Sequence, residues 1–300
     1  MTVIEVQNLR KAYGDTVAVQ DVSFTVESGE IFGILGPNGA GKTTTVESIA
    51  GLRSADSGTI RVLGRDPSDT SLRYEVGVQL QESGLPDRLT VREALDLYAT
   101  FYPEPADWRA LTRELGLGEK LATAYGKLSG GQKQRLSIAL ALIGSPKIAI
   151  LDELTTGLDP QARRDTWDLI ESVRDSGVTI VLVTHFMAEA ERLCDRIAVI
   201  DHGRVVALDT PAGLIAGLDT EQRIRFRPSA PVDDALLTAR PEVREVIRHG
   251  SQIEVVGTGN LLHAVTSVLA VNEIIAADLR IEQASLDDAF VQLTGRSTKE

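Results

Sequence analysis

The residues with the clearest chemical meaning form one glycine-rich stretch, Gly36-Pro37-Asn38-Gly39-Ala40-Gly41-Lys42-Thr43. Glycine at both ends, followed by lysine and threonine, is the pattern of a phosphate-binding loop. Its glycines let the backbone curl so that successive N–H groups point at phosphate oxygens, and the positive end of a helix beginning at Lys42 adds to the site. We expect this loop and the adjacent Thr44 to bind a nucleotide, with Lys42 at the β- and γ-phosphates and the Thr43 hydroxyl on Mg²⁺. The alternative is a glycine-rich turn that only links a strand to a helix.

Two carboxylates follow a short apolar run at residues 148–151, which predicts a buried strand ending at Asp152 and Glu153. Such a strand end can hold a metal ion, so Asp152 is expected to coordinate Mg²⁺ directly or through water. Glu153 would then polarise the attacking water. Acidic pairs at strand ends are often only solvated, but the preceding loop favours the chemical interpretation.

The elements that must position these residues alternate between strand and helix. Strand patterns cover residues 30–35, 148–151 and 179–183, and helical patterns cover residues 42–50 and 160–176. Alternation of this kind predicts an α/β fold with a mostly parallel sheet covered by helices. Residues 84–145 are predicted to be largely helical.

The pattern changes near residue 218, so we predict a first domain at residues 1–218 and a second at residues 219–300. The second reads strand, helix, strand, strand, helix, strand, followed by a last helix at residues 285–293. That order is typical of a small α+β unit of the ferredoxin-like kind. A tight turn at residues 248–251 suits a hairpin between the middle strands.

Composition excludes several classes of function. The chain has 31 basic and 43 acidic residues, a net charge of −12, which argues against nucleic-acid binding because that depends on a basic face. Cys194 is the only cysteine, so neither an internal disulfide nor a cysteine metal cluster is expected. The first residues lack the apolar core of a secretory signal, and no stretch approaches the ~18 to 20 apolar residues of a membrane helix. We therefore expect a chain that stays in a reducing compartment.

A second candidate anion site is Leu128-Ser129-Gly130-Gly131-Gln132, which resembles the signature motif of ABC ATPases in sequence and in its spacing to Asp152. Physically it is another helix N-terminus with small residues. An ordinary serine-capped helix is the alternative. The resemblance implies the ABC type of P-loop NTPase, with a mixed sheet and a helical subdomain. It also implies that residues 129–132 close over the γ-phosphate held by a second copy, giving a homodimer when ATP is bound.

Four further residues match landmarks of this family one by one. By resemblance, Tyr13 stacks on adenine, Gln81 links the metal site to the transport channel, Asp159 crosses between subunits and His185 contacts the γ-phosphate. In isolation each has a plainer explanation: a half-buried tyrosine, a polar loop residue, a helix N-cap before a proline, and a core histidine. The chain departs from the family at Leu154, where proline is common, and at residues 79–81, where Gln79 is a weaker candidate for the role of Gln81.

Residues 184–196, 201–204 and 285–295 narrow the resemblance to the ATPases of the daunorubicin-resistance type, although sodium and lipid-linked exporters share the pattern. This implies Mg²⁺-dependent ATP hydrolysis that powers a separate transmembrane permease, export of drugs or other hydrophobic compounds, and a place on the inner face of the membrane. The rivals are a soluble ABC protein acting on ribosomes or DNA, and a metal-independent nucleotide-binding regulator, which leaves the two carboxylates unexplained. The second domain is expected either to stabilise the homodimer or sense a ligand, or only to cover a sheet edge.

Overall fold

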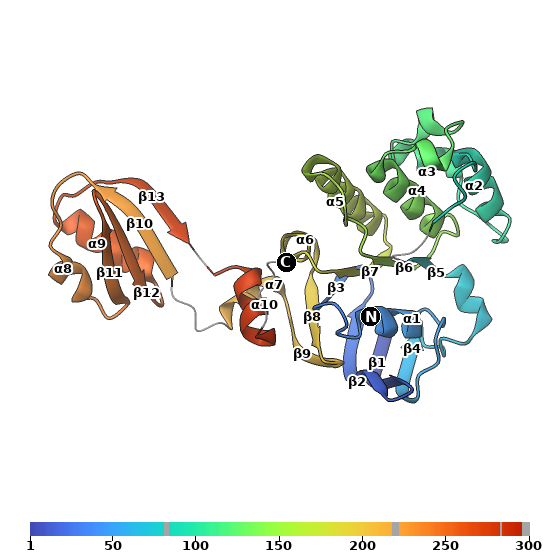
Figure 1. The fold of residues 1–300 in the computed structure, drawn as a ribbon, viewed down its shortest axis with the longest axis horizontal. Helices are drawn as coiled ribbons and strands as arrows, with labels where there is room; N and C mark the ends of the chain where they lie inside the picture. The colour runs from blue at the N-terminus through green and yellow to red at the C-terminus, as the bar shows by residue number, and fades with distance from the viewer. Residues whose placement is uncertain (81–83, 218–221, 283, 296–300) are drawn as a thin grey trace. The chain divides into compact units, whose positions relative to one another are not determined.

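The computed structural model describes residues 1–80, 84–217, 222–282 and 284–295, in two compact units, Met1–Ala212 and Gly213–Glu300. Figure 1 shows the ribbon of both. In these ranges no helix has the length and apolar character that crossing a lipid bilayer requires.

A nine-stranded mixed sheet forms the centre of the first unit, in the order β4-β1-β2-β9-β8-β3-β7-β6-β5. Strands β3, β5, β6, β7 and β8 run parallel to one another, whereas β1, β2 and β4 pair antiparallel and β9 is antiparallel to β8. The strand bounds are β1 Thr2–Tyr13, β2 Thr16–Glu27, β3 Ile31–Leu35, β4 Ser57–Val62, β5 Val76–Gln79, β6 Ile148–Asp152, β7 Thr179–Thr184, β8 Arg196–Asp201 and β9 Arg204–Asp209.

The parallel strands are short and apolar because both faces of this part of the sheet are covered. Every residue of β3, β6 and β7 is buried. Phe24 of β2 and Phe32 of β3 stack in the core with ring centroids 5.0 Å apart. The predicted α/β architecture is confirmed, and the sheet gives the loop after β3 and the carboxylates at the end of β6 a rigid support.

Helices α2, α3 and α4 lie together in Figure 1, within the region predicted to be helical. Helix α2 starts with a capping box between Thr90 and Glu93, as its sequence predicts. The helices of the first unit are α1 Lys42–Ile49, α2 Val91–Ala99, α3 Trp108–Glu114, α4 Gly130–Leu142, α5 Pro160–Asp175 and α6 Met187–Leu193, with 3₁₀ turns η1 Thr70–Tyr74, η2 Gly118–Lys120 and η3 Tyr125–Lys127; α7 Pro211–Ala216 spans the boundary between the units.

The second unit is a four-stranded antiparallel sheet in the order β11-β12-β10-β13. Relative to the chain this places the first strand between the third and the fourth, which is the ferredoxin-like arrangement predicted from the order of elements. Buried apolar side chains of β10, β12 and α9 form its core, among them Phe226, Val255 and Val265. The bounds are β10 Gln222–Pro228, α8 Asp234–Thr238, β11 Val243–His249, β12 Gln252–Gly257, α9 Leu261–Val271, β13 Ala276–Glu282 and α10 Leu286–Thr294.

Candidate functional site

The glycine-rich loop connects β3 to α1 and leaves the carboxyl end of a strand with parallel neighbours on both sides, β7 and β8. Its glycines are required by close packing against the sheet. A Cβ atom at Gly36 would lie 2.2 Å from the Ile200 carbonyl oxygen, and one at Gly41 would lie 2.4 Å from that of Ala18. Gly41 also has a φ of 101°, which L side chains rarely adopt. The loop is therefore fixed to the sheet at both ends.

Lys42 begins α1 and turns its side chain back into this loop. Its Nζ donates hydrogen bonds to the carbonyl oxygens of Gly36, at 2.8 Å, and Pro37, at 3.2 Å, and the residue is only 6% exposed. Burial lowers the pKa of this amine, and the nearby carboxylates of Glu153 and Asp152 oppose that shift. The first turn of α1 carries no acidic residue, so its positive end is open to an anion.

Asp152, the last residue of β6, is a buried carboxylate that lacks the partners such a group needs. It is 1% exposed, and neither carboxylate oxygen has a hydrogen-bond partner within the described parts of the chain. Burial, and then the neighbouring charge of Glu153, raises the pKa of Asp152 to about 6. A buried carboxylate of this kind is expected to be paired or to coordinate a metal, so the site fits Mg²⁺.

Glu153 and His185 are 32 residues apart in sequence and meet because β6 and β7 are neighbours. The Glu153 Oε1 atom lies 3.2 Å from Nδ1 of His185, and the two side chains are 9% and 37% exposed. The Glu153 N–H donates to the Val183 carbonyl oxygen at 2.9 Å. Glu153 has a φ of 52°, a left-handed conformation that is strained for a residue with a Cβ. Glu153, predicted to polarise the attacking water, and His185, predicted to contact the γ-phosphate, are thus brought together.

The signature residues form the start of α4. Ser129 caps this helix in a capping box with Gln132: the Ser129 N–H donates to the glutamine Oε1 at 3.0 Å, and the Gln132 N–H donates to the serine hydroxyl at 3.3 Å. Gly130 and Gly131 lie close to the start of α5, since a Cβ atom at Gly130 would lie 3.4 Å from Leu158 and one at Gly131 would lie 3.3 Å from Ala162. In one copy of the chain, the side chains of Ser129 and Gln132 are therefore bonded within this helix end.

The structure places the remaining predicted residues as follows. Asp159 accepts hydrogen bonds from the N–H groups of Gln161 and Ala162, each at 2.9 Å. Within one copy of the chain it therefore acts as the N-cap of α5. Tyr13, at the end of β1, is 41% exposed, with the Arg53 guanidinium carbon 5.4 Å from its ring centroid. Gln81 lies outside the described residues.

Gln79 has a contact that sequence reasoning did not predict. It is 5% exposed, and its Oε1 accepts from the Asp152 N–H at 3.2 Å while its Nε2 donates to the Leu80 carbonyl oxygen at 2.8 Å. The parallel register pairs Gln79 with Leu151, which puts its amide beside the metal-site strand. In the sequence, Gln79 is distinguished only as a weaker candidate for the role of Gln81.

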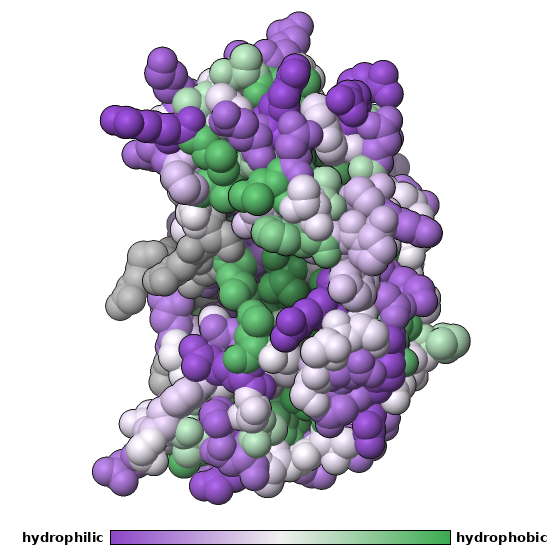
Figure 2. All heavy atoms as spheres, turned by 90° about the vertical axis from the view of Figure 1, so that its right-hand side faces the viewer, coloured by the Kyte–Doolittle hydropathy of each residue, from purple (hydrophilic) through white to green (hydrophobic). Residues whose placement is uncertain are grey.

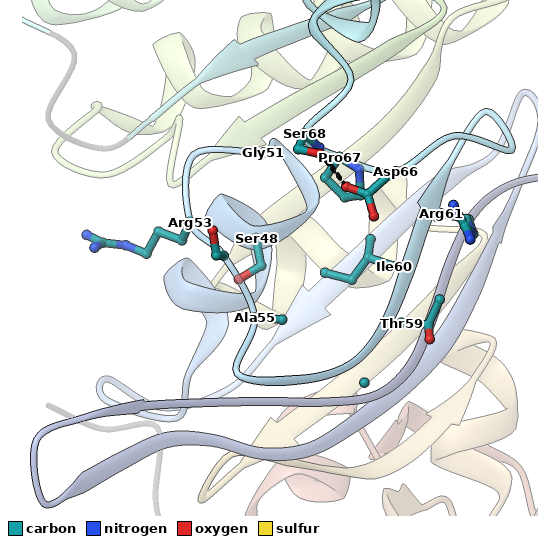
Figure 3. Close-up of a pocket in the computed structure, with 12 residues that line it drawn as sticks. Ser48, Gly51, Arg53, Ala55, Thr59, Ile60, Arg61, Asp66, Pro67 and Ser68 are labelled. Atoms are coloured by element: carbon teal, nitrogen blue, oxygen red, sulfur yellow. Dashed lines mark hydrogen bonds between the residues drawn. The ribbon is translucent and has the colours of Figure 1, made fainter.

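A surface cavity of about 450 Å³ lies elsewhere, next to the C-terminal end of α1. Figure 3 shows Ile60 pointing into it and Asp66 bonded to Ser68 at its edge, while Arg53 points away. None of its lining residues belongs to the loop at residues 36–43, and Ser48 lies roughly one and a half helical turns beyond Lys42. This cavity is separate from the candidate site.

Comparison with known proteins agrees with the geometry. The family described as ABC transporter matches residues 19–156. Nod factor export ATP-binding protein I of Paraburkholderia xenovorans is 39% identical over 99% of this chain and 98% of its own length. Linearmycin resistance ATP-binding protein LnrL of Bacillus subtilis is 33% identical over 99% of this chain and 100% of its own.

Solved structures lead to the same family. An ATP-binding subunit of an ABC transporter is 32% identical with a TM-score of 0.64, over 71% of this chain and 92% of that one. The protein cbiO1 of Clostridium perfringens, part of an ABC transporter complex, is 29% identical with a TM-score of 0.66, over 72% of this chain and 91% of its own. The chain therefore belongs to the ABC transporter family, as an ATP-binding subunit that hydrolyses ATP.

Proposed function

We propose that the loop at residues 36–43 and the Asp152–Glu153 pair form the Mg²⁺-dependent hydrolytic site, and that two copies of the chain use it to power export through a separate transmembrane permease. The observation that carries this proposal is the contact of 3.2 Å between Glu153 and His185, next to a buried carboxylate, that of Asp152, whose oxygens accept no hydrogen bond from the described residues. Two groups able to orient water lie beside a group able to hold a metal.

The chain's own groups each have a part in ATP hydrolysis. Lys42 exchanges its bonds to the loop carbonyls for the β- and γ-phosphate oxygens, and the residues of the loop up to Thr44, apart from Pro37, donate backbone N–H groups. Asp152 and the Thr43 hydroxyl would hold Mg²⁺, with Gln81 as a further ligand. When bound, the metal offsets phosphate charge. Glu153 accepts a hydrogen bond from the attacking water, which displaces ADP from the γ-phosphorus in line, and His185 keeps Glu153 oriented.

The second copy completes the site in this proposal. Ser129, with Gly130, Gly131 and Gln132, caps the γ-phosphate bound by the other chain, and Asp159 meets that chain as well. The supporting observation is that Ser129, Gly130 and Asp159 are solvent-exposed at two helix N-termini that pack against one another.

Permease docking is supported by an apolar hollow on the first unit. A cavity of about 310 Å³ is lined by Ile49, Leu52, Leu72, Val76 and Tyr102 among others. Large apolar side chains are exposed in the same segments, with Leu52 58% and Phe101 59% exposed. Figure 2 shows apolar residues gathered in a hollow on this unit. Exposed apolar patches mark interaction sites, so we infer that a permease at the inner face of the membrane binds there.

The proposed direction and cargo come from the relatives, whose names specify Nod factor export and linearmycin resistance. We infer export of a drug-like or other hydrophobic compound. Purification from membranes in detergent tests the association with a permease: the chain is expected to co-purify with a membrane-spanning protein. A chain that never does so favours the soluble rival that acts on ribosomes or DNA.

The second unit is proposed as an accessory domain that stabilises the homodimer or senses a ligand. Its separate core and ferredoxin-like sheet support an independent fold, and covering a sheet edge remains the alternative.

The hydrolytic assignment is tested with Glu153→Gln, which keeps size and hydrogen bonding but removes the charge. We expect ATP binding to be retained, ATP-bound dimers to accumulate, and kcat to fall by about 10²-fold or more, as for loss of a general base. The matched control is Glu104→Gln, at an exposed glutamate in the same unit, which should hydrolyse ATP at the wild-type rate. Unchanged hydrolysis by Glu153→Gln would remove Glu153 from this role.

A further inference from the structure

Behind the Glu153–His185 pair, three side chains form a stack. The ring of His185 packs on that of Phe186 with centroids 4.1 Å apart, and the guanidinium carbon of Arg163, a residue of α5, lies 4.4 Å from the Phe186 centroid. A cation over an aromatic face is attracted by the ring quadrupole, and arginine is well suited to such stacking. The stack connects helix α5 with the side chain that bonds Glu153.

Among the residues that the structure describes, Arg163 has no carboxylate partner that would explain its position. Its Nε is buried and has no hydrogen-bond partner within the described ranges, and no ion pair of Arg163 is found there either. By contrast, Arg164 is exposed and donates to the Gln161 side chain at 3.0 Å. Removing part of a guanidinium from water is unfavourable, so the contact with Phe186 is the interaction that keeps Arg163 where it is.

The backbone of Phe186 is held on both sides. Its N–H donates to the Thr184 hydroxyl at 3.0 Å, and its carbonyl oxygen accepts from the N–H groups of Glu189 and Ala190, each at 3.2 Å. These bonds fix the backbone that carries the Phe186 ring, and that ring contacts both the Arg163 guanidinium and the His185 ring.

Arg163 is also bound to the start of α5. Its N–H donates at 3.0 Å to the carbonyl oxygen of Asp159, the residue that caps the helix one turn earlier. One turn further along, the Trp167 Nε1 donates to the buried Glu189 of α6 at 2.9 Å. Consecutive turns of α5 thus contact the segment that carries His185.

We propose that Arg163 is a positioning residue for hydrolysis: through Phe186 it holds His185 in the orientation that bonds Glu153, and it couples that orientation to the Asp159 end of α5. This inference rests on the proposed roles of Glu153 and His185. Arg163 contacts neither of those two side chains through a hydrogen bond and acts through Phe186.

The kinetic test compares Arg163→Ala with Arg163→Lys and with the matched control Arg164→Ala. We expect Arg163→Ala to lower kcat about 3- to 30-fold, the range that follows from losing a cation–π contact, with ATP affinity and KM unchanged. Arg163→Lys should restore most of the rate, and Arg164→Ala should match wild type. Equal loss of kcat in both alanine variants, or a change confined to KM, would overturn the proposal.

A second measurement does not depend on activity. The chain has only four histidines, so His185 can be followed by NMR of histidine-labelled protein and assigned with His185→Ala. Arg163→Ala should move the His185 ring signals and leave those of His202, His249 and His263 in place, whereas Arg164→Ala should move none. An unmoved His185 signal would refute the positioning role. If the wild-type chain hydrolysed no ATP, the proposed function would fail while this measurement still reported on Arg163.

Discussion

Two helix N-termini in the first unit carry glycine-rich motifs, and they differ in how they treat polar groups. At α1, Lys42 is buried near the carboxylate of Asp152, which is also buried and has no hydrogen-bond partner in the part of the chain that the structure describes. At α4, Ser129 and Gln132 satisfy each other in an exposed capping box. The first end contains charges that are unfavourable without a ligand, and the second contains none.

This difference shows which helix end can bind phosphate and metal in a single copy of the chain. Buried charge at α1 is stabilised when phosphate and metal arrive, so that end is built for binding at some expense in stability. The α4 end is stable alone and becomes a ligand only if a second chain brings it to the phosphate. Substitutions of the charged residues at the α1 end should therefore lower activity but raise stability. Substitutions of the capping residues at the α4 end should lower both.

The largest expected effect is on the pH dependence of stability at the α1 end. The folded-state pKa of Asp152, about 6, lies above its ordinary value of 3.8, so the folded chain binds this proton more tightly than the unfolded chain. Stability is then lost as pH rises from about 4 to about 6, by about 3 kcal/mol without metal or nucleotide. Asp152→Asn should lack this loss. Denaturant unfolding in EDTA checks it, and equal pH slopes in both proteins would contradict it.

Next in size is the effect of Lys42→Ala on ATP binding. Loss of charge-assisted bonds to the phosphates should weaken ATP binding about 10- to 100-fold. Isothermal titration or a fluorescent ATP analogue measures it, with Lys147→Ala as the control because that lysine is 68% exposed and pairs with Glu75. Wild-type affinity in Lys42→Ala would mean that the α1 end is not the primary phosphate site.

At the α4 end, Ser129→Ala should lower kcat roughly tenfold by removing one hydrogen bond to the γ-phosphate, while ATP binding to one copy stays the same. It should also destabilise the fold by about 1 kcal/mol through loss of the cap. Thr90→Ala removes a capping box of the same kind from α2 and should cost similar stability with no change in kcat. If both variants slowed turnover equally, capping alone would explain Ser129.

The smallest effect is expected from deleting residues 221–300, because neither helix end lies in the second unit. ATP affinity should not change. Dimerisation and ATPase rate, measured by sedimentation and phosphate release, separate the two hypotheses for this unit: a decrease supports the dimer or sensor role, and no change in either dismisses it.

Sequence reasoning succeeded where local pattern and tertiary structure agree. The glycine loop, the apolar strand before Asp152 and the order of elements in the second unit are all local signals. The alternation of apolar and polar residues predicts a first strand at residues 2–9, but β1 runs to Tyr13, because register shifts around Asn8 and Leu9 interrupt this alternation. Strand β9 was not predicted, since it is largely exposed and lacks a clear alternating pattern.

Contacts between distant segments could not be read in the same way. The contact between Glu153 and His185 was not predicted, since the resemblance implied only that His185 contacts the γ-phosphate. The bond from Asp152 to Gln79 and the stack of Arg163 on Phe186 depend on strand order and on the packing of α5. A single sequence gives no distance between such residues.

The left-handed backbone at Glu153 has a consequence for protein engineering. Glycine or asparagine adopts this conformation more readily than glutamate, with a gain of about 1 kcal/mol for glycine. A screen that ranks substitutions only by heat resistance would thus favour changes at residues 152 and 153 together. The most heat-resistant variants from such a screen are expected to be ones that have lost the power to drive transport.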